Sequence, residues 1–149
     1  MTRMWRVSRL PYVNLSGEGA RIAGGRWNSP GRALVYAAEN PALAVLEVRV
    51  HLDLEPDLIP ADYVLMEIDA SGLDVESVAT PPADPTGFGD KWLAEGRTPI
   101  LRVPSFIVPQ SFNLLLNPLH PAAASASVMD TQPFDLDKRL WLPLTTTTS

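Results

Sequence analysis

Fifteen prolines in 149 residues limit this chain to short elements of secondary structure. Proline lacks a backbone donor and interrupts a helix or a central strand wherever it falls in the interior. The stretches between the prolines therefore favour strands and loops over long helices. The chain is long enough to bury one hydrophobic core, and it shows no internal repeat. We expect a single domain of the α+β class over residues 1–149, with small mixed or antiparallel sheets and few helices.

Alternating and apolar segments predict the strands. Residues 4–8 alternate between apolar and polar side chains, which is typical of a half-buried strand. Further strands are expected at residues 33–38, 63–68, 100–103, 112–116 and 127–129. Loops are expected at residues 24–31 and 81–89, and a frayed tail at residues 143–149.

The helices are predicted mainly from their start signals. Asn40 followed by Pro41 is typical of a helix start, because asparagine caps free backbone amides and proline fits the first helical position. We expect this helix to run from about Pro41 to Leu52. A shorter second helix is expected around residues 90–95.

The charge of the chain is unevenly distributed. The net charge of −5 argues against a general nucleic-acid binder. Residues 1–50 contain seven arginines and three glutamates, whereas the remainder contains five basic and fourteen acidic residues. An arginine-rich region on an acidic protein favours a small anionic ligand over a long polyanion, although most of these arginines, taken singly, are compatible with surface charges.

Several classes of protein are disfavoured by what the chain lacks. There is no run of about 18 apolar residues that would predict a membrane span, and no apolar segment follows the N-terminal arginines as in a secretory signal. The chain has no cysteine and two histidines without an HExxH motif, so thiolate sites are excluded and a metal site is not expected. We expect a cytoplasmic protein with no membrane partner.

Glu47 is the most unusual polar residue, because it lies within an apolar stripe of the expected helix. Leu43, Leu46 and Val50 recur at helical spacing around it, and a second apolar stripe predicts burial of much of the helix. A carboxylate in such a place must be paired, protonated or open to a cavity. Two interpretations remain: a functional carboxylate, or a glutamate at the edge of the core that pairs with His51.

The segment GGRWNSPG at residues 24–31 places Arg26 beside glycines that let the backbone approach a ligand closely. The guanidinium has five planar donors that suit a diphosphate, but a tight turn with Arg26 in a structural salt bridge is the alternative. The segment is neither a P-loop nor a GxGxxG motif. Tyr36, within ALVYAA, is either a core tyrosine with a satisfied hydroxyl or a ring that faces a flat heterocycle.

Two further polar residues follow predicted strands. Ser105 comes after a strand and a proline, and its surroundings are not GxSxG, so a hydrolase nucleophile elbow is not expected. Asn117 precedes a proline, and Asn-Pro is a common turn. A structural turn is therefore the simpler interpretation of Asn117.

In their order along the chain, these segments resemble the RES domain family. The matching segments are WRVSR, GEGARIAGGRWNSPGRALVYAAENPALAVLEVRVHL, LRVPSFIVPQSFNLLLNPLHP and PFDLDKRLW, which span about residues 5–141. The family is named for an Arg, a Glu and a Ser, matched here by Arg26, Glu47 and Ser105. Residues 53–91 match only loosely, which leaves the target and the acceptor of the reaction open.

The resemblance implies an ADP-ribosyltransferase-like fold and a reaction that consumes NAD as substrate, with no metal. Members are toxins paired with an Xre-type helix-turn-helix antitoxin. Some members split NAD with water or phosphate, and some transfer ADP-ribose to a protein. The implied partners are the antitoxin, NAD and, for a transferase, a protein target. A homodimer within the antitoxin complex is compatible with this, and direct nucleic-acid binding is not implied.

The resemblance also implies a role for each matched residue. Glu47 would stabilise the oxocarbenium-like charge on ribose as nicotinamide leaves, as carboxylates do in glycosidases. Arg26 would bind the diphosphate or ribose side and Tyr36 would pack on nicotinamide, which makes these three the catalytic group. The residues expected to support NAD binding are Ser105, Asn117 and Arg6. A ribonuclease toxin and a non-enzymatic binding module remain as alternatives.

Overall fold

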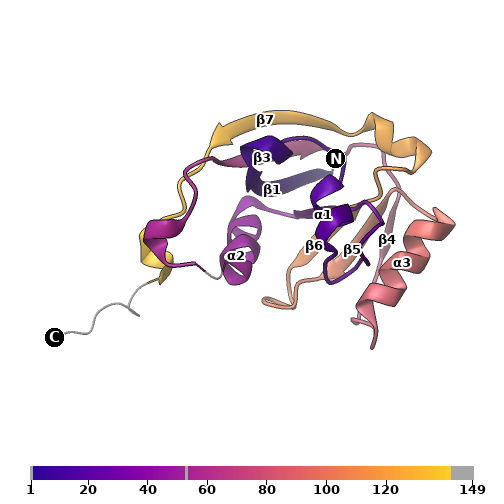
Figure 1. Cartoon of the computed structure of the whole chain (residues 1–149). Coiled ribbons are helices and arrows are strands. Elements are labelled where there is room, and N and C mark those ends of the chain that lie inside the picture. Colours follow the sequence, from indigo (N-terminus) through magenta and orange to yellow (C-terminus); the bar gives the residue numbers. More distant parts are fainter. Residues whose placement is uncertain (1, 53, 142–149) are drawn as a thin grey trace.

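The computed structural model describes residues 2–52 and 54–141 and contains one seven-stranded mixed sheet in the order β4-β5-β6-β2-β1-β3-β7 (Figure 1). The strands are β1 (Arg3–Arg9), β2 (Val35–Ala38), β3 (Tyr63–Asp69), β4 (Val75–Ser77), β5 (Ile100–Pro104), β6 (Phe112–Leu116) and β7 (Ser127–Pro133). The α-helices are α1 (Glu18–Ala23), α2 (Pro41–His51) and α3 (Pro85–Glu95). The predicted α+β class is confirmed, and the expected small sheets form one continuous sheet.

The sheet is least continuous at its centre. β1 pairs with β3 over its whole length and β2 pairs with β6 over its whole length, but β1 and β2 share only the register pair Trp5–Ala38. Beyond this pair the two strands diverge. The sheet therefore consists of a β7-β3-β1 part and a β2-β6-β5-β4 part, which Figure 1 shows turned relative to each other.

Helices α2 and α3 pack on the same face of the sheet: α3 lies on the β2-β6-β5-β4 part, and α2 lies across the junction of β1 and β2. α3 packs through the buried Trp92 against Leu115, and α2 packs through Leu43 against Ala38. Leu115 lies opposite Tyr36, which shares a sheet face with Ala38 because side chains alternate along a strand. The largest buried cluster fills the opposite face. The two helices thus leave a space between them over the point where β1 and β2 separate.

Helix α2 begins as the sequence predicts. The Asn40 side chain accepts a hydrogen bond from the Leu43 backbone amide at 2.8 Å, and Pro41 follows at the first helical position. Burial along α2 is less extensive than predicted, because only Leu43 and Ala44 are fully buried and Val50 is 54 % exposed. One side of the helix, which carries Ala44, Glu47 and His51, lines an open pocket.

Helix α3 corrects a predicted loop. The sequence interpretation placed a loop over residues 81–89 and a helix only over residues 90–95, whereas the helix begins at Pro85. The Asp84 side chain accepts from the Gly87 amide at 3.0 Å. Asp84 and Pro85 therefore cap and start α3 in the same way that Asn40 and Pro41 start α2. The start was not predicted because Gly87 and Gly89 in the first turns are poor helix formers.

Other differences are smaller. Helix α1 and strand β4 were not predicted, because both are short and neither shows a clear periodicity. Strand β7 is longer than the predicted residues 127–129. Strand β1 is not half-buried: Ser8, on the predicted polar side, is 6 % exposed because β1 lies inside the sheet and is covered on both faces. The predicted tail at residues 143–149 lies outside the described residues.

Candidate active site

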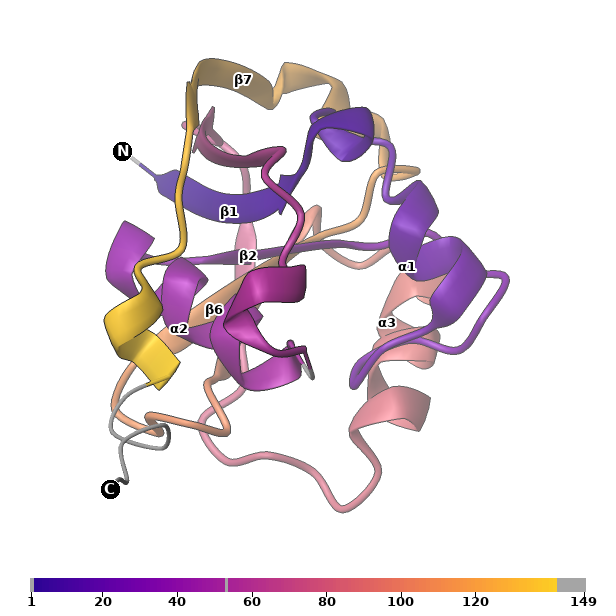
Figure 2. The ribbon, with the colours of Figure 1, turned by 60° about the vertical axis from the view of Figure 1, so that its left-hand side comes forward.

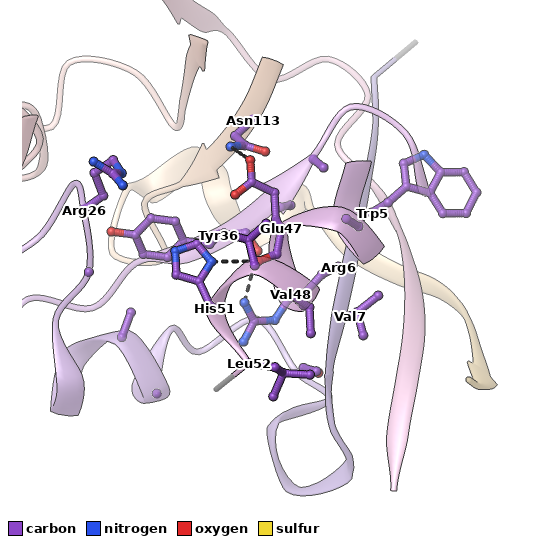
Figure 3. Close-up of a pocket in the computed structure, with 18 of the residues that line it drawn as sticks. Trp5, Arg6, Val7, Arg26, Tyr36, Glu47, Val48, His51, Leu52 and Asn113 are labelled. Atoms are coloured by element: carbon purple, nitrogen blue, oxygen red, sulfur yellow. Dashed lines mark hydrogen bonds between the residues drawn. The ribbon is translucent and has the colours of Figure 1, made fainter. Parts of the chain in front are cut away.

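A pocket of about 660 Å³ opens where β1 and β2 diverge. This volume lies within the range of small-molecule sites. The walls come from β1, β2, α2, the Gly24–Gly31 loop and the residues around Phe106. Figure 2 shows α2 and α1, the helix that leads into this loop, on opposite sides of β2. Among its lining residues are Arg6, Arg26, Tyr36 and Glu47 (Figure 3).

The carboxylate of Glu47 is held by two neutral donors. Its Oε2 accepts a hydrogen bond from Ser105 Oγ at 2.8 Å and another from Asn113 Nδ2 at 2.8 Å. Both bonds end on one oxygen, and among the described residues none is found for Oε1. The charge of Glu47 is therefore oriented by the fold, with one oxygen available to a ligand in the pocket.

The alternative interpretation of Glu47, a side-chain pair with His51, is wrong. His51 Nδ1 lies 2.7 Å from the backbone oxygen of Glu47 and not beside its carboxylate (Figure 3). The side chain of Glu47 turns toward β6 and the strand end at Ser105 instead. Of the two interpretations, the functional carboxylate is the one that agrees with this geometry.

Arg6 fills the gap between the diverging strands. Its Nη1 donates to the Tyr36 backbone oxygen at 3.0 Å, at the place where a continuous β1–β2 ladder would supply a backbone donor. Its Nε is buried and has no hydrogen-bond partner among the described residues. Burial lowers the pKa of Arg6 from that of a solvated arginine. A buried guanidinium with an unused donor favours an anion or an oxygen-rich ligand in the pocket.

Tyr36 combines the two roles that its sequence context left open. Its hydroxyl donates to Asn28 Oδ1 at 2.6 Å and accepts from the Trp27 amide at 2.9 Å, while the residue lines the pocket. Burial raises the pKa of Tyr36 to about 12, so the hydroxyl stays protonated and keeps its donor. Gly25 lies so close that an added Cβ would be 2.6 Å from the hydroxyl oxygen. The loop and the tyrosine therefore fix one another.

Arg26 is exposed, and its guanidinium lies 4.0 Å from the centroid of the Phe106 ring. Its backbone oxygen accepts a hydrogen bond from Thr86 Oγ1 at 2.9 Å. This stacking contact takes the place of the structural salt bridge that was the alternative interpretation. The cationic head is thus presented at the pocket edge from a fixed backbone.

A comparison of the whole sequence with known families identifies the family of the chain. The model of the RES domain family matches residues 3–137. The chain belongs to the RES domain family. The resemblance of the quoted motifs is thereby confirmed.

Named relatives cover nearly the whole RES chain. The Prs ADP-ribosylating toxin of Sphingobium sp. is 40% identical over 157 aligned residues, which cover 93% of this chain and 96% of that protein. Toxin Res of Pseudomonas putida is 38% identical, with 93% and 99% covered. A chain in the crystal structure of the M. tuberculosis MbcT-MbcA toxin-antitoxin complex has a TM-score of 0.72 and 22% identity, with 91% and 85% covered. This last likeness supports the α+β fold.

Two of the residues expected to support NAD binding, Ser105 and Asn117, lie apart from the pocket lining. Ser105 is 1 % exposed, and its Oγ accepts from the Ile107 and Val108 amides at 3.0 and 3.1 Å while donating to Glu47. It lies behind Glu47 and does not face the pocket. Asn117 closes the turn after β6 by accepting from the Leu119 amide at 3.1 Å, which agrees with the simpler interpretation of the Asn-Pro pair.

Asn113 is the site residue that the sequence interpretation missed. It pairs with Ala38 across β2 and β6, so it shares a sheet face with Tyr36 and reaches Glu47. The available signal was a polar side chain two residues before the buried Leu115, on the covered face of a strand.

Within the described residues, no group of three or more His, Cys, Asp or Glu side chains could hold a metal ion. No helix of the described residues has the length and apolar character of a membrane span.

Proposed function

We propose that this RES protein is the toxin of a toxin–antitoxin pair and breaks the bond between nicotinamide and ribose in NAD. The names of its relatives support the reaction class, since the Sphingobium relative is called an ADP-ribosylating toxin. The structural neighbour, from a toxin–antitoxin complex, supports an antitoxin partner. The observation that carries the proposal is the oriented carboxylate of Glu47 beside two arginines in one pocket.

Glu47 stabilises the transition state by its charge. Departure of nicotinamide leaves positive charge on the ribose carbon, and a fixed carboxylate stabilises such a charge without reorganising. Nicotinamide leaves as a neutral molecule with the electron pair of the broken bond, so its departure requires no general acid. The available Oε1 of Glu47 faces this charge or a ribose hydroxyl.

The other pocket residues hold the substrate in place. Arg26 and the buried Arg6 supply donors for the diphosphate and the ribose oxygens. Tyr36 presents its ring to the nicotinamide side, and its hydroxyl is already satisfied by the Gly24–Gly31 loop. Positioning of this kind lowers the barrier because the ribose carbon is held beside Glu47 before the bond breaks.

We propose the partners and the location that the family resemblance implies. The antitoxin is of the Xre helix-turn-helix type and pairs with the toxin in the cytoplasm, where the complex can contain a toxin homodimer. NAD is the substrate, and no metal takes part. A protein that accepts ADP-ribose is a further partner, as the name of the Sphingobium relative suggests.

The test is the release of nicotinamide from NAD by the purified protein. Glu47→Gln preserves the shape of the side chain but removes its charge, so we expect turnover to fall by about two to three powers of ten. Glu55→Gln removes an exposed carboxylate outside the pocket and should leave turnover unchanged. Near-normal turnover of a folded Glu47→Gln variant would overturn the proposal.

The same preparation separates the two alternatives. RNA cleavage without loss of NAD would favour a ribonuclease toxin, although the net charge of −5 speaks against it. Neither activity, together with binding of the antitoxin, would favour a non-enzymatic module.

A further inference from the structure

His51 lies on the last turn of α2, one helical turn after Glu47, and lines the same pocket. Its Nδ1 is 2.7 Å from the backbone oxygen of Glu47. A carbonyl oxygen can only accept a hydrogen bond, so Nδ1 must carry the proton. In the neutral ring the other nitrogen, Nε2, then has a free lone pair. The backbone contact therefore fixes His51 as the tautomer in which Nε2 is a base.

The position of His51 suits a group that meets an incoming molecule. His51 is exposed, whereas Glu47 is partly buried and bonded to the buried Ser105. Figure 3 shows the imidazole among the pocket side chains, with Nε2 directed away from the helix. His51 is therefore accessible to a water or hydroxyl that enters the pocket from solvent.

His51 differs from its neighbours in its chemical type. The other titratable side chains that line the pocket are Arg6, Arg9, Tyr12, Arg26, Tyr36, Tyr63 and Glu47. An arginine offers only donors, and the Glu47 carboxylate is already bonded to Ser105 and Asn113. Of the described side chains that line the pocket, His51 is the one imidazole, and its Nε2 lone pair can accept a proton.

We propose that His51 Nε2 is the general base that takes the proton of the acceptor, a neutral O–H group of water or of a target side chain. The proposal rests on the proposed function, since it describes how the acceptor is activated in that reaction. As the acceptor oxygen forms a bond to the ribose carbon, its proton passes to Nε2. Nicotinamide leaves in the same step with the electron pair of the broken bond, so its release depends on attack by the acceptor. The imidazolium then releases the proton to solvent, so atoms and charge balance without a further reactant.

A substitution at position 51 can separate this role from a structural one. His51→Asn keeps an N–H donor near the position of Nδ1 but has no basic nitrogen, and His51→Gln places a non-basic amide near the position of Nε2. Because the side chain is exposed, both variants should fold. In water alone we expect both to release nicotinamide about a hundredfold more slowly than the unchanged protein, the usual contribution of a general base.

Azide provides the decisive comparison, because it is an anion that attacks without losing a proton. Added azide should restore nicotinamide release by His51→Asn to near the unchanged rate and give ADP-ribosyl azide, identified by its mass. Glu47→Gln should stay slow with azide, since the missing charge stabilises the cationic ribose whichever nucleophile attacks.

The outcomes are distinct from a failure of the proposed function. If the unchanged protein releases no nicotinamide under any condition, the proposed function is wrong and this proposal is wrong with it. If the unchanged protein is active and His51→Asn matches it in water, only the role of His51 is overturned. A variant that is equally slow with and without azide also overturns it, because His51 then acts on structure or on NAD binding.

Discussion

The two sides of the pocket hold their charged groups in different ways. On the α2 side, one carboxylate oxygen of Glu47 receives hydrogen bonds from Ser105 and Asn113, both at 2.8 Å. On the loop side, the backbone oxygen of Arg26 accepts a hydrogen bond from Thr86, but its exposed guanidinium only stacks on the ring of Phe106. Hydrogen bonds therefore fix the carboxylate group of Glu47 itself. In Arg26 they fix only the backbone, and the guanidinium can change its position.

This difference corresponds to two roles in the proposed reaction, stabilisation of the transition state and binding of the substrate. A group that stabilises a transition state must already point at the developing charge, because reorientation costs free energy at the moment of reaction. A group that anchors a substrate contributes equally before and during the reaction. We therefore expect changes on the α2 side to lower kcat, and changes on the loop side to raise KM.

The largest effect is expected for a substitution in α3 where this helix contacts the Gly24–Gly31 loop. Gly89 of α3 is so close to the loop that an added Cβ would overlap the Trp27 backbone oxygen, at 1.8 Å. We expect Gly89→Ala to lower the free energy of unfolding by about 3 kcal/mol, because neither backbone can yield easily. Urea denaturation measures the change.

A second helical glycine provides the control for Gly89. At Gly19 an added Cβ would make ordinary contact with Tyr12 at 3.8 Å. Gly19→Ala should therefore be neutral, or stabilising by up to about 1 kcal/mol through helix propensity. Equal stability of the two variants would show that α3 does not hold the loop rigidly.

The next largest effect should appear at Ser105. Its oxygen accepts from two backbone amides, so its one proton is directed to Glu47. Ser105→Ala removes a bond that orients the carboxylate, and a small misplacement of a catalytic group can cost up to about a hundredfold in rate. We expect a lower kcat with little change in KM, and recovery in Ser105→Thr, which restores the hydroxyl. A change confined to KM would place Ser105 in contact with the substrate and not behind Glu47.

Most of the fold could be predicted from local signals. The cap at Asn40 and the apolar alternation of strands such as β3 are decided by neighbouring residues, and the structure confirms them. The opening between β1 and β2 could not be predicted in this way. It depends on which strands pair and where the pairing ends after Trp5 and Ala38, and those contacts join distant parts of the chain.

The candidate site shows the same division. The residues themselves pointed to Glu47, because a carboxylate among apolar residues requires a reason to be there, and to Arg26, because glycines flank it. Arg6 came only from the family resemblance. It did not identify Asn113, whose contact with Glu47 depends on the register between β2 and β6. The family resemblance identified Ser105 and Asn117 as site residues but not their positions. Only the three-dimensional contacts show that Ser105 lies behind the Glu47 carboxylate and that Asn117 lies in a separate turn.

A moderate effect is expected at the head of Arg26. Arg26→Lys keeps the charge but replaces a planar fork of donors by a single ammonium, which binds a diphosphate less well. We expect KM for NAD to rise by about tenfold, equivalent to about 1.4 kcal/mol, with kcat nearly unchanged. Steady-state kinetics at several NAD concentrations measures both values. A fall in kcat as large as the rise in KM would mean that Arg26 also acts on the transition state, and the contrast between the two sides would disappear.

The smallest effect should come from Phe106, the ring on which the guanidinium rests. The two groups are 4.0 Å apart, and the ring is 43% exposed, so the contact belongs to the weaker class of cation–π interactions. Phe106→Leu removes about 0.5–1 kcal/mol of that interaction and should raise KM by about two- to fivefold. The same substitution in the Arg26→Lys background should add less, because the planar stack is already lost. If the changes in KM from the two substitutions are additive, Phe106 acts by contacting the substrate and not by holding the Arg26 guanidinium.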